Sequence, residues 1–222
     1  MIEQRNDQWF AARCGLITAS NFFKCMTNPK TKKAKDDGEL SETAKTFMDE
    51  VVAEMDSGIP IEKGQTTAMK WGNDWEDSAR DEAIEVLSEK FGRNDFHPAF
   101  GENAFIVHPK YPGFGCSPDF LVGEDALGEL KCPYNGGRHV TSCLSTAAWF
   151  LKEHGWQIMG GLWVTGRQKY YCATYNPRSK ARPLEMVTIE RNEKAIQELE
   201  TRLLAFRSIV LNRLAQFRRQ PF

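Results

Sequence analysis

Two acidic residues and a lysine form the set of side chains with the clearest chemical potential in this chain. Asp119 follows a Ser-Pro pair, and Glu129 and Lys131 come later in a Glu-Leu-Lys segment. Carboxylate oxygens are ligands that Mg²⁺ prefers, and the ion can stabilise charge that develops on a phosphate. Residues two apart on a strand point to the same face, so Lys131 can contact an attacking water beside Glu129. The pattern predicts a metal-dependent phosphodiesterase site, although an edge-strand acid followed by an exposed Glu–Lys turn would look the same.

The surrounding segments predict strands that bring these residues together. Segments 104–108, 116–122 and 127–132 are short and bounded by Pro and Gly, which predicts three strands of one meander. Adjacent strands lie about 4.8 Å apart, so the carboxylates of Asp119 and Glu129 can share one ion. The backbone carbonyl of Leu130 is a candidate for a further oxygen ligand. Two more strands are predicted at 169–175 and 184–189.

Helices are predicted on both sides of these strands. Capping residues and apolar spacing indicate short helices at 6–14 and 19–26, and longer ones at 41–55, 66–91, 147–164 and from Asn192 onward. The polar segment 30–40 predicts an exposed loop. This order predicts an α/β (α+β) fold with a central mixed sheet flanked by helices. We found no internal repeat or linker, so we expect one domain over residues 1–222, with a helical part (1–95) packed on a sheet core (96–222).

Composition narrows the classes of function. The 222 residues carry a formal net charge of −1 and are 41% apolar, which suits a globular domain and does not favour a general nucleic-acid coat protein. No apolar run approaches the ~20 residues of a membrane span, and the first residues show no signal peptide. The six cysteines form no C-x-x-C pair, which favours reduced thiols, and the four histidines lack the spacing of a zinc protease.

The segment before the second short helix has the components of a phosphate pocket. Thr18 is predicted to cap that helix, whose first N–H groups and partial positive charge attract anions. Arg13 lies just before it and offers a two-pronged donor, while Ser20 offers a hydroxyl in the first turn. Ordinary capping with a solvated Arg13 explains the same residues and stays open at this point.

Two further polar residues could support the metal site. Glu76 shares a helix face with Gly72 and Arg80, so it could be an outer carboxylate of the site or simply pair with Arg80 for about 0.3 kcal/mol. Gln157 interrupts an apolar helix, and a buried Gln needs hydrogen-bond partners. It could hold a water or a phosphate oxygen near the metal, or bond to a neighbouring backbone group.

Together these segments resemble the phage lambda exonuclease family, also called the YqaJ-like viral recombinase nucleases. The matching stretches occur in the family's order over roughly residues 7 to 195: Arg13 to Ser20, Trp71-Gly72 with Glu76 and Arg80, Cys116 to Asp119, Glu129 to Pro133, Gln157 with Trp163-Val164, Tyr175 to Arg178, and Ile189 to Arg191. One departure is Met159, which stands where the family often has a second glutamine. Segment 136–146 also matches the family poorly.

The resemblance implies a PD-(D/E)xK, restriction-endonuclease-like core and a Mg²⁺-dependent 5′→3′ exonuclease on double-stranded DNA. Such an enzyme releases mononucleotides and leaves a 3′ single-stranded tail for a single-strand annealing protein. The resemblance further implies two Mg²⁺ ions, which Mn²⁺ can replace, and a homotrimeric ring around the DNA. It places the enzyme in the cytoplasm of a bacterial host. A restriction-type endonuclease on the same core and a non-catalytic DNA-end-binding protein are the alternatives.

The resemblance also implies a role for each site residue. The metal ligands would be the carboxylates of Asp119 and Glu129 and the carbonyl of Leu130, and Lys131 would orient or activate the water. Glu76 and Gln157 would be supporting members of the catalytic site. The pocket for the 5′ phosphate would consist of Arg13, Ser20 and Ser117.

Overall fold

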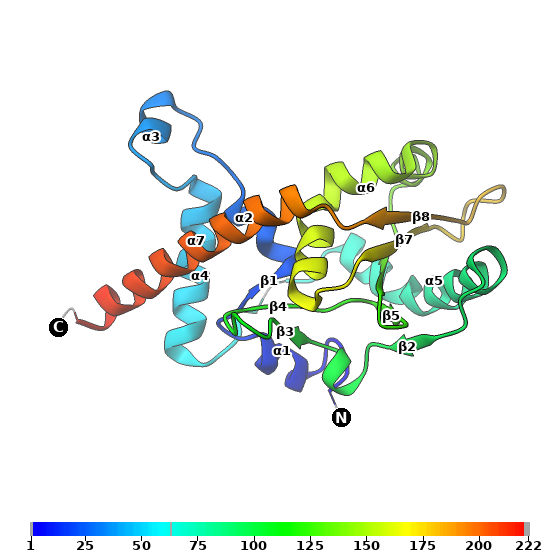
Figure 1. Ribbon diagram of the computed structural model, residues 1–222, viewed down its shortest axis with the longest axis horizontal. Helices are drawn as coiled ribbons and strands as arrows, with labels where there is room; N and C mark the ends of the chain where they lie inside the picture. The colour runs from blue at the N-terminus through cyan, green and yellow to red at the C-terminus, as the bar shows by residue number, and fades with distance from the viewer. Residues whose placement is uncertain (1, 63, 220–222) are drawn as a thin grey trace.

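A five-stranded mixed sheet lies at the centre of the molecule, as a computed structural model shows for residues 2–62 and 64–219 (Figure 1). Its strands run in the order β2-β5-β6-β7-β8, with β6 and β7 parallel and the other neighbours antiparallel. Their bounds are Phe96–Pro98 (β2), Phe120–Val122 (β5), Ala126–Lys131 (β6), Lys169–Tyr175 (β7) and Leu184–Glu190 (β8). The predicted fold class, a mixed sheet flanked by helices, is confirmed.

Helices cover both faces of this sheet, and the side chains along each strand point alternately to one face and the other. Helices α2 (Phe22–Cys25), α4 (Glu42–Ser57), α6 (Gly136–Thr165) and α7 (Glu193–Arg219) contribute to one core, and α5 (Thr67–Phe91) contributes to the other. In β6, Leu127 belongs to the α6 side, whereas Ala126 and Leu130 belong to the α5 side. Because side chains alternate along a strand, Glu129 and Lys131 share the side of Leu127.

A small second sheet corrects the prediction of a three-stranded meander. Strands β1 (Ile17–Thr18), β4 (Phe114–Cys116) and β3 (Ile106–Val107) form it in the order β1-β4-β3. The predicted strand 116–122 is therefore split between two sheets, with the break after Cys116. Pro118 has no N–H to donate to a ladder, so a continuous strand through this position would lose a hydrogen bond. Strand β2 was not predicted.

Most helix boundaries follow the predicted caps. The side chains of Asn6, Ser41 and Thr66 accept hydrogen bonds from the first turns of α1 (Asp7–Arg13), α4 and α5. Asn192 does the same for α7 through the N–H of Ala195. These side chains satisfy N–H groups that a helix leaves free at its start.

Two predicted helices and one predicted loop need correction. Segment 19–26 is a 3₁₀ turn, η1 (Ala19–Asn21), followed by α2, and Thr18 lies in β1 without a capping hydrogen bond. Segment 30–40 contains a short helix, α3 (Lys32–Asp36), which Thr31 caps. Helix α6 begins at residue 136 rather than 147, and a kink at Thr146 (φ 40°, ψ −117°) separates its two parts. A second 3₁₀ turn, η2 (Gly101–Asn103), precedes β3.

Two glycines permit close approaches that bear on the site. A Cβ on Gly128 would lie 2.2 Å from the ring of Phe120, so only glycine lets β5 and β6 pack in this register. A Cβ on Gly160 would lie 2.4 Å from the ring of Phe22, which explains a glycine inside a buried helix. Close packing at these points outweighs the cost of about 1 kcal/mol that glycine imposes on regular structure.

The extent of the domain stays a prediction, and residues 1, 63 and 220–222 of the expected span 1–222 lie outside the described part. Within that part, none of the helices combines the length and the apolar character that crossing a bilayer requires.

Candidate active site

Strands β5 and β6 bring Asp119, Glu129 and Lys131 together. Asp119 directly precedes β5, and its backbone N–H donates to the carbonyl of Gly128 over 3.0 Å. Its Oδ2 accepts from the N–H of Leu130 over 2.5 Å. On β6, Lys131 Nζ donates to Glu129 Oε1 over 2.5 Å. The three residues therefore form one cluster, in which Glu129 and Lys131 face the α6 side of the sheet from β6, a central strand rather than an edge strand.

Gln157 on α6 joins this cluster from the adjacent helix. Its Nε2 donates to Glu129 Oε1 over 2.7 Å, and Lys131 Nζ donates to its Oε1 over 3.4 Å. Of the two sequence interpretations of Gln157, the location beside the carboxylates is therefore the one that the structure adopts.

Glu129 carries an unsatisfied oxygen inside the protein. Its side chain is 3% exposed, and its Oε2 is buried without a hydrogen-bond donor from any described residue. A buried polar atom without a partner costs free energy, and the cost is larger for a charged group. Such an atom beside a second carboxylate is a candidate ligand for a cation.

The electrostatics of the cluster also favour a cation. Burial, together with the charges of Glu129 and Glu76, raises the pKa of Asp119 well above its usual range. Burial disfavours the charge of Lys131, but the carboxylates of Glu129 and Asp119 outweigh this effect and raise its pKa. A divalent ion between the carboxylates would relieve the repulsion that remains.

The residues present fit a hard divalent cation such as Mg²⁺. Within residues 2–62 and 64–219, no three His, Cys, Asp or Glu side chains converge as a metal-binding group. An ion would therefore be held by the carboxylates of Asp119 and Glu129, with main-chain and water oxygens completing its shell. Mg²⁺ commonly binds through one or two carboxylates and keeps several waters. The role of the Leu130 carbonyl in this shell stays a prediction.

Glu76 lies on α5 close enough to influence Asp119, and it is held by two arginines. Its Oε1 accepts from Arg80 Nη2 over 3.3 Å, and its Oε2 pairs with Arg5 Nη2. The Glu76–Arg80 pair expected from spacing therefore forms. The charge of Glu76 also acts on Asp119, so the pair does not exclude a supporting role in the site.

Arg13 and Ser117 both contact Trp9, and Ser20 contacts Arg13. Arg13 Nη2 donates to Ser20 Oγ over 3.4 Å and to Thr18 Oγ1 over 3.3 Å, and its guanidinium lies 3.9 Å from the centroid of the Trp9 ring. Trp9 Nε1 donates to Ser117 Oγ over 3.0 Å. Ser117 in turn lies two residues before Asp119, so this cluster adjoins the carboxylates.

The cluster around Trp9 suits an anion. Burial lowers the pKa of Arg13 to about 10, which leaves it cationic at neutral pH. Its hydrogen bonds among the described residues go to hydroxyl groups, and no carboxylate there forms an ion pair with it. Because Thr18 starts no regular helix, the donors for an anion would be Arg13 and the two serines rather than a helix N-terminus.

Sequence reasoning missed three residues near the site. Trp9 is one turn before Arg13 on α1, and this i, i+4 spacing could have indicated the contact. Gln4 Nε2 donates to the carbonyl of Pro118 over 2.7 Å. Arg5 contacts Glu76 from a left-handed backbone conformation (φ 72°). No local pattern predicts that the segment before α1 lies against the loop of Ser117 and Pro118.

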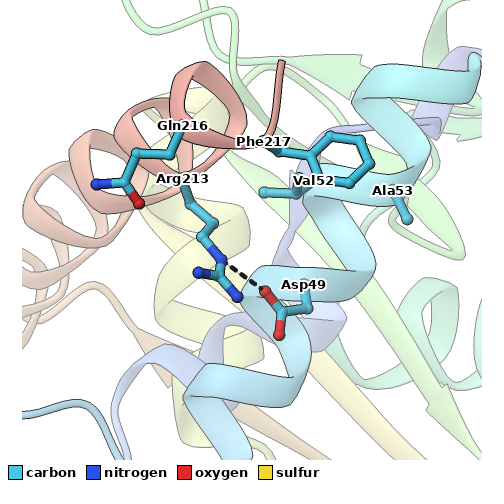
Figure 2. Close-up of a pocket in the computed structure, with 6 residues that line it drawn as sticks. All are labelled: Asp49, Val52, Ala53, Arg213, Gln216 and Phe217. Carbon is cyan, nitrogen blue, oxygen red and sulfur yellow. Dashed lines mark hydrogen bonds and ion pairs between the residues drawn. The ribbon is translucent and has the colours of Figure 1, made fainter. Parts of the chain in front are cut away.

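A groove of about 310 Å³ elsewhere on the molecule lies between α4 and α7. Figure 2 shows its lining, in which Arg213 Nε pairs with Asp49 Oδ1 over 3.2 Å and Phe217 borders Val52. Its position near the C-terminal end of α7 is distant from β5 and β7 (Figure 1). None of the residues Asp119, Glu129, Lys131 and Gln157 lines this groove.

The chain belongs to the family of YqaJ-like viral recombinase domains, whose model matches residues 8–168. This span contains Arg13, both carboxylates, Lys131 and Gln157. The predicted family membership is therefore confirmed.

Solved structures give relatives over nearly the full chain. The alkaline exonuclease LHK-Exo from Laribacter hongkongensis is 27% identical with a TM-score of 0.78, and the match covers 96% of this chain and 97% of that one. The complex of LHK-Exo with dAMP matches equally well. A phage-related exonuclease from Haemophilus somnus 129PT, 17% identical with a TM-score of 0.65 over 91% of this chain and 96% of that one, shares the fold. These matches confirm the PD-(D/E)xK-type core.

One curated relative has a short match. The uncharacterized protein ExoD of Escherichia coli (strain K12) is 47% identical over 38 residues, which are 17% of this chain and 44% of that protein. The chain thus spans less than half of the length of this relative.

Proposed function

We propose that this protein is a Mg²⁺-dependent exonuclease that digests one strand of double-stranded DNA from its 5′ end, releases mononucleotides and leaves a 3′ single-stranded tail. The observation that carries the proposal is the buried carboxylate of Glu129, held by Lys131 and Gln157 next to Asp119, with one oxygen unpaired. Family membership and the likeness to an alkaline exonuclease support a nuclease.

The chain's own residues would act by positioning and by charge. When bound, Mg²⁺ would lower the pKa of a water and stabilise charge on the phosphate. Lys131, protonated and 24% exposed, would donate to the attacking water or to a phosphate oxygen and so orient the two reactants. Gln157 would keep Glu129 in one rotamer, because its amide occupies the oxygen that Lys131 also contacts.

The cluster around Trp9 would supply the polarity of digestion. A 5′ phosphate bound by Arg13, Ser20 and Ser117 would place the neighbouring phosphodiester near Asp119, since Ser117 and Asp119 are two residues apart. We further propose the assembly that the family resemblance implies, a homotrimeric ring around DNA with two Mg²⁺ ions per site, replaceable by Mn²⁺. Its partners would be double-stranded DNA ends and a single-strand annealing protein, in the cytoplasm of a bacterial host.

The main test uses linear duplexes with a 5′ phosphate, a 3′ phosphate or neither, incubated with and without Mg²⁺. We expect Mg²⁺-dependent release of mononucleotides from the 5′-phosphorylated strand. Asp119→Ala and Lys131→Ala should abolish release while DNA binding survives. Full activity in either variant, or digestion from the 3′ end, would refute the assignment.

The phosphate pocket has its own test. Arg13→Ala should slow digestion of 5′-phosphorylated ends and leave digestion of 5′-hydroxyl ends nearly unchanged, because only the former present the dianion. Arg213→Ala, which removes a distant arginine paired with Asp49, is the matched control. An equal loss on both kinds of end would argue against the pocket.

An endonuclease on the same core is the second candidate, since the carboxylates and Lys131 serve either reaction. A covalently closed circular duplex separates the two, because it has no end to enter. An exonuclease leaves the circle intact, and an endonuclease linearises it.

A further inference from the structure

A cluster of aromatic side chains and one arginine lies beyond the catalytic lysine and has no part in the chemistry described above. It consists of Trp71 and Trp75 on α5, Tyr134 after β6, and Arg178 after β7. The guanidinium of Arg178 lies 3.9 Å from the centroid of the Trp71 ring and 5.4 Å from that of Tyr134. Trp71 and Tyr134 meet edge to face at 5.7 Å, and Trp75 lies 5.5 Å from Trp71.

The cluster adjoins the catalytic site through two chain connections. Tyr134 is three residues after Lys131, so the two Cα atoms are at most about 11 Å apart. Trp75 immediately precedes Glu76 on α5, whose charge acts on Asp119. Trp71 and Trp75 lie over the α5 side of the sheet and Lys131 faces the α6 side, so a nucleotide next to the scissile phosphate would reach the cluster around the end of β6, where Lys131 and Tyr134 lie.

A buried asparagine holds the cluster in place. Asn176 is 2% exposed, and its Nδ2 donates to the carbonyl of Pro133 over 3.0 Å. Its Oδ1 accepts from the backbone N–H of Arg178, also over 3.0 Å. One side chain thus fixes the segments that carry Tyr134 and Arg178 relative to each other, so their arrangement does not depend on a mobile loop.

Two groups in the cluster have unused binding capacity. Tyr134 is 45% exposed, which is a large fraction for an aromatic ring in a packed cluster. Arg178 is exposed, and no carboxylate in the described part of the chain forms an ion pair with it. Lys180, also exposed, adds positive charge to the same turn. An exposed ring beside an unpaired planar cation suits a flat aromatic ligand that carries negative charge.

We propose that Tyr134, Arg178 and Trp71 form a stacking site for an unpaired nucleobase at a DNA end, next to the catalytic carboxylates. This inference rests on the proposed function, because it takes the ligand to be the DNA that the site cleaves. Stacking would hold a base that has left the duplex and would keep its phosphate near Lys131. The base could belong to the digested 5′-ended strand or to its 3′-ended complement.

The test measures how much binding depends on the base itself. Each duplex ends in a fork of two unpaired nucleotides on each strand. In one set of duplexes, the unpaired nucleotides of the 5′-ended strand are either adenines or abasic residues. In the second set, the same change is made in the 3′-ended strand. Binding is measured by fluorescence anisotropy in a Lys131→Ala background with Mg²⁺. We expect the abasic change to weaken binding about 5- to 100-fold in one of the two sets, which identifies the strand.

The variants separate stacking from charge and from stability. In Tyr134→Ala and Arg178→Ala, adenine and abasic forks should bind with nearly equal affinity, whereas Tyr134→Phe should keep the difference. Arg178→Lys keeps the charge but loses the planar group, so it should also lose the difference. Phe217→Ala, which removes an exposed aromatic near the C-terminal end of α7, is the control and should behave like the background.

Two results would overturn the inference. One is a loss of affinity for abasic forks in Tyr134→Ala that is as large as in the Lys131→Ala protein. The other is equal affinity for adenine and abasic forks in both sets of duplexes. A merely structural cluster would lower the melting temperature of Tyr134→Ala without changing the ratio of the two affinities. Failure of the proposed function is a separate result, namely no Mg²⁺-dependent digestion of any linear duplex by the unmodified protein.

Discussion

Replacing Lys131 by methionine tests the electrostatic interpretation of the site most directly. Methionine keeps most of the side-chain volume but leaves Glu129, 3% exposed, without its cation. Removing one partner of a buried ion pair costs about 3–5 kcal/mol, because the other charge stays buried without compensation. Lys131 is 24% exposed, so water can partly replace it, and we expect the lower end, about 3 kcal/mol. For a chain of this size, that lowers the melting temperature by roughly 6–12 °C.

A double-mutant cycle gives the measurement its control. Glu129→Gln with Lys131→Met removes both charges, so the double variant should be more stable than the sum of the two single effects predicts. The free energy of unfolding is measured by urea denaturation without divalent ions for all four proteins. If Lys131→Met is as stable as the wild type and the effects of the two changes are additive, the ion pair contributes nothing to the free energy of unfolding, and the electrostatic interpretation is wrong.

Three further predictions concern the metal, the backbone and pH. Mg²⁺ should raise the melting temperature of the wild type but raise that of Asp119→Asn much less, because a ligand stabilises the state that binds it; equal shifts, followed by differential scanning fluorimetry, would contradict the metal site. Arg5→Gly should be about 1 kcal/mol more stable than Arg5→Ala in urea denaturation, since glycine adopts φ 72° without strain; the reverse order would show that the conformation is not strained. Hydrogen bonding from Arg93 lowers the pKa of Asp125 to about 2. The ionised Asp125 carboxylate therefore stabilises the folded state at pH values above the ordinary pKa of an aspartate, and this stabilisation is lost as the pH falls through about 2. Asp125→Asn should therefore cost about 1 kcal/mol at pH 7, a value reduced for solvent screening, and nothing below pH 2; a cost that does not change with pH would refute this.

Local sequence determined much of the scaffold and pointed to the candidate catalytic residues Asp119, Glu129 and Lys131. Asn6, Ser41, Thr66 and Asn192 were recognisable as caps because their side chains bond to N–H groups within the next turn. Strands β7 and β8 were also predicted, since both are bounded by turn residues. These features depend on neighbours within a few positions, which is why one sequence is enough to find them.

The strand assignment failed where the competing partners are distant in sequence. A continuous strand over 116–122 looked favourable by composition, but β4 pairs in parallel with β1, whose residues lie near position 17. That pairing, with the absence of an N–H at Pro118, ends β4 before Asp119. Likewise, the first part of α6 was missed because segment 136–146 is rich in Gly, Ser and Thr, which are weak helix formers.

The sequence by itself determined which residues could do the chemistry: Asp119, Glu129 and Lys131, whose types and spacing are local properties. Only the tertiary structure decided that Gln157 bonds to Glu129 and that Trp9 joins Arg13 to Ser117, as well as which oxygen is left unpaired. Periodicity specifies the face on which a side chain lies but not the element packed against that face. Burial and hydrogen bonding between distant segments therefore complete the site, and they depend on how the sheet, α1 and α6 pack together.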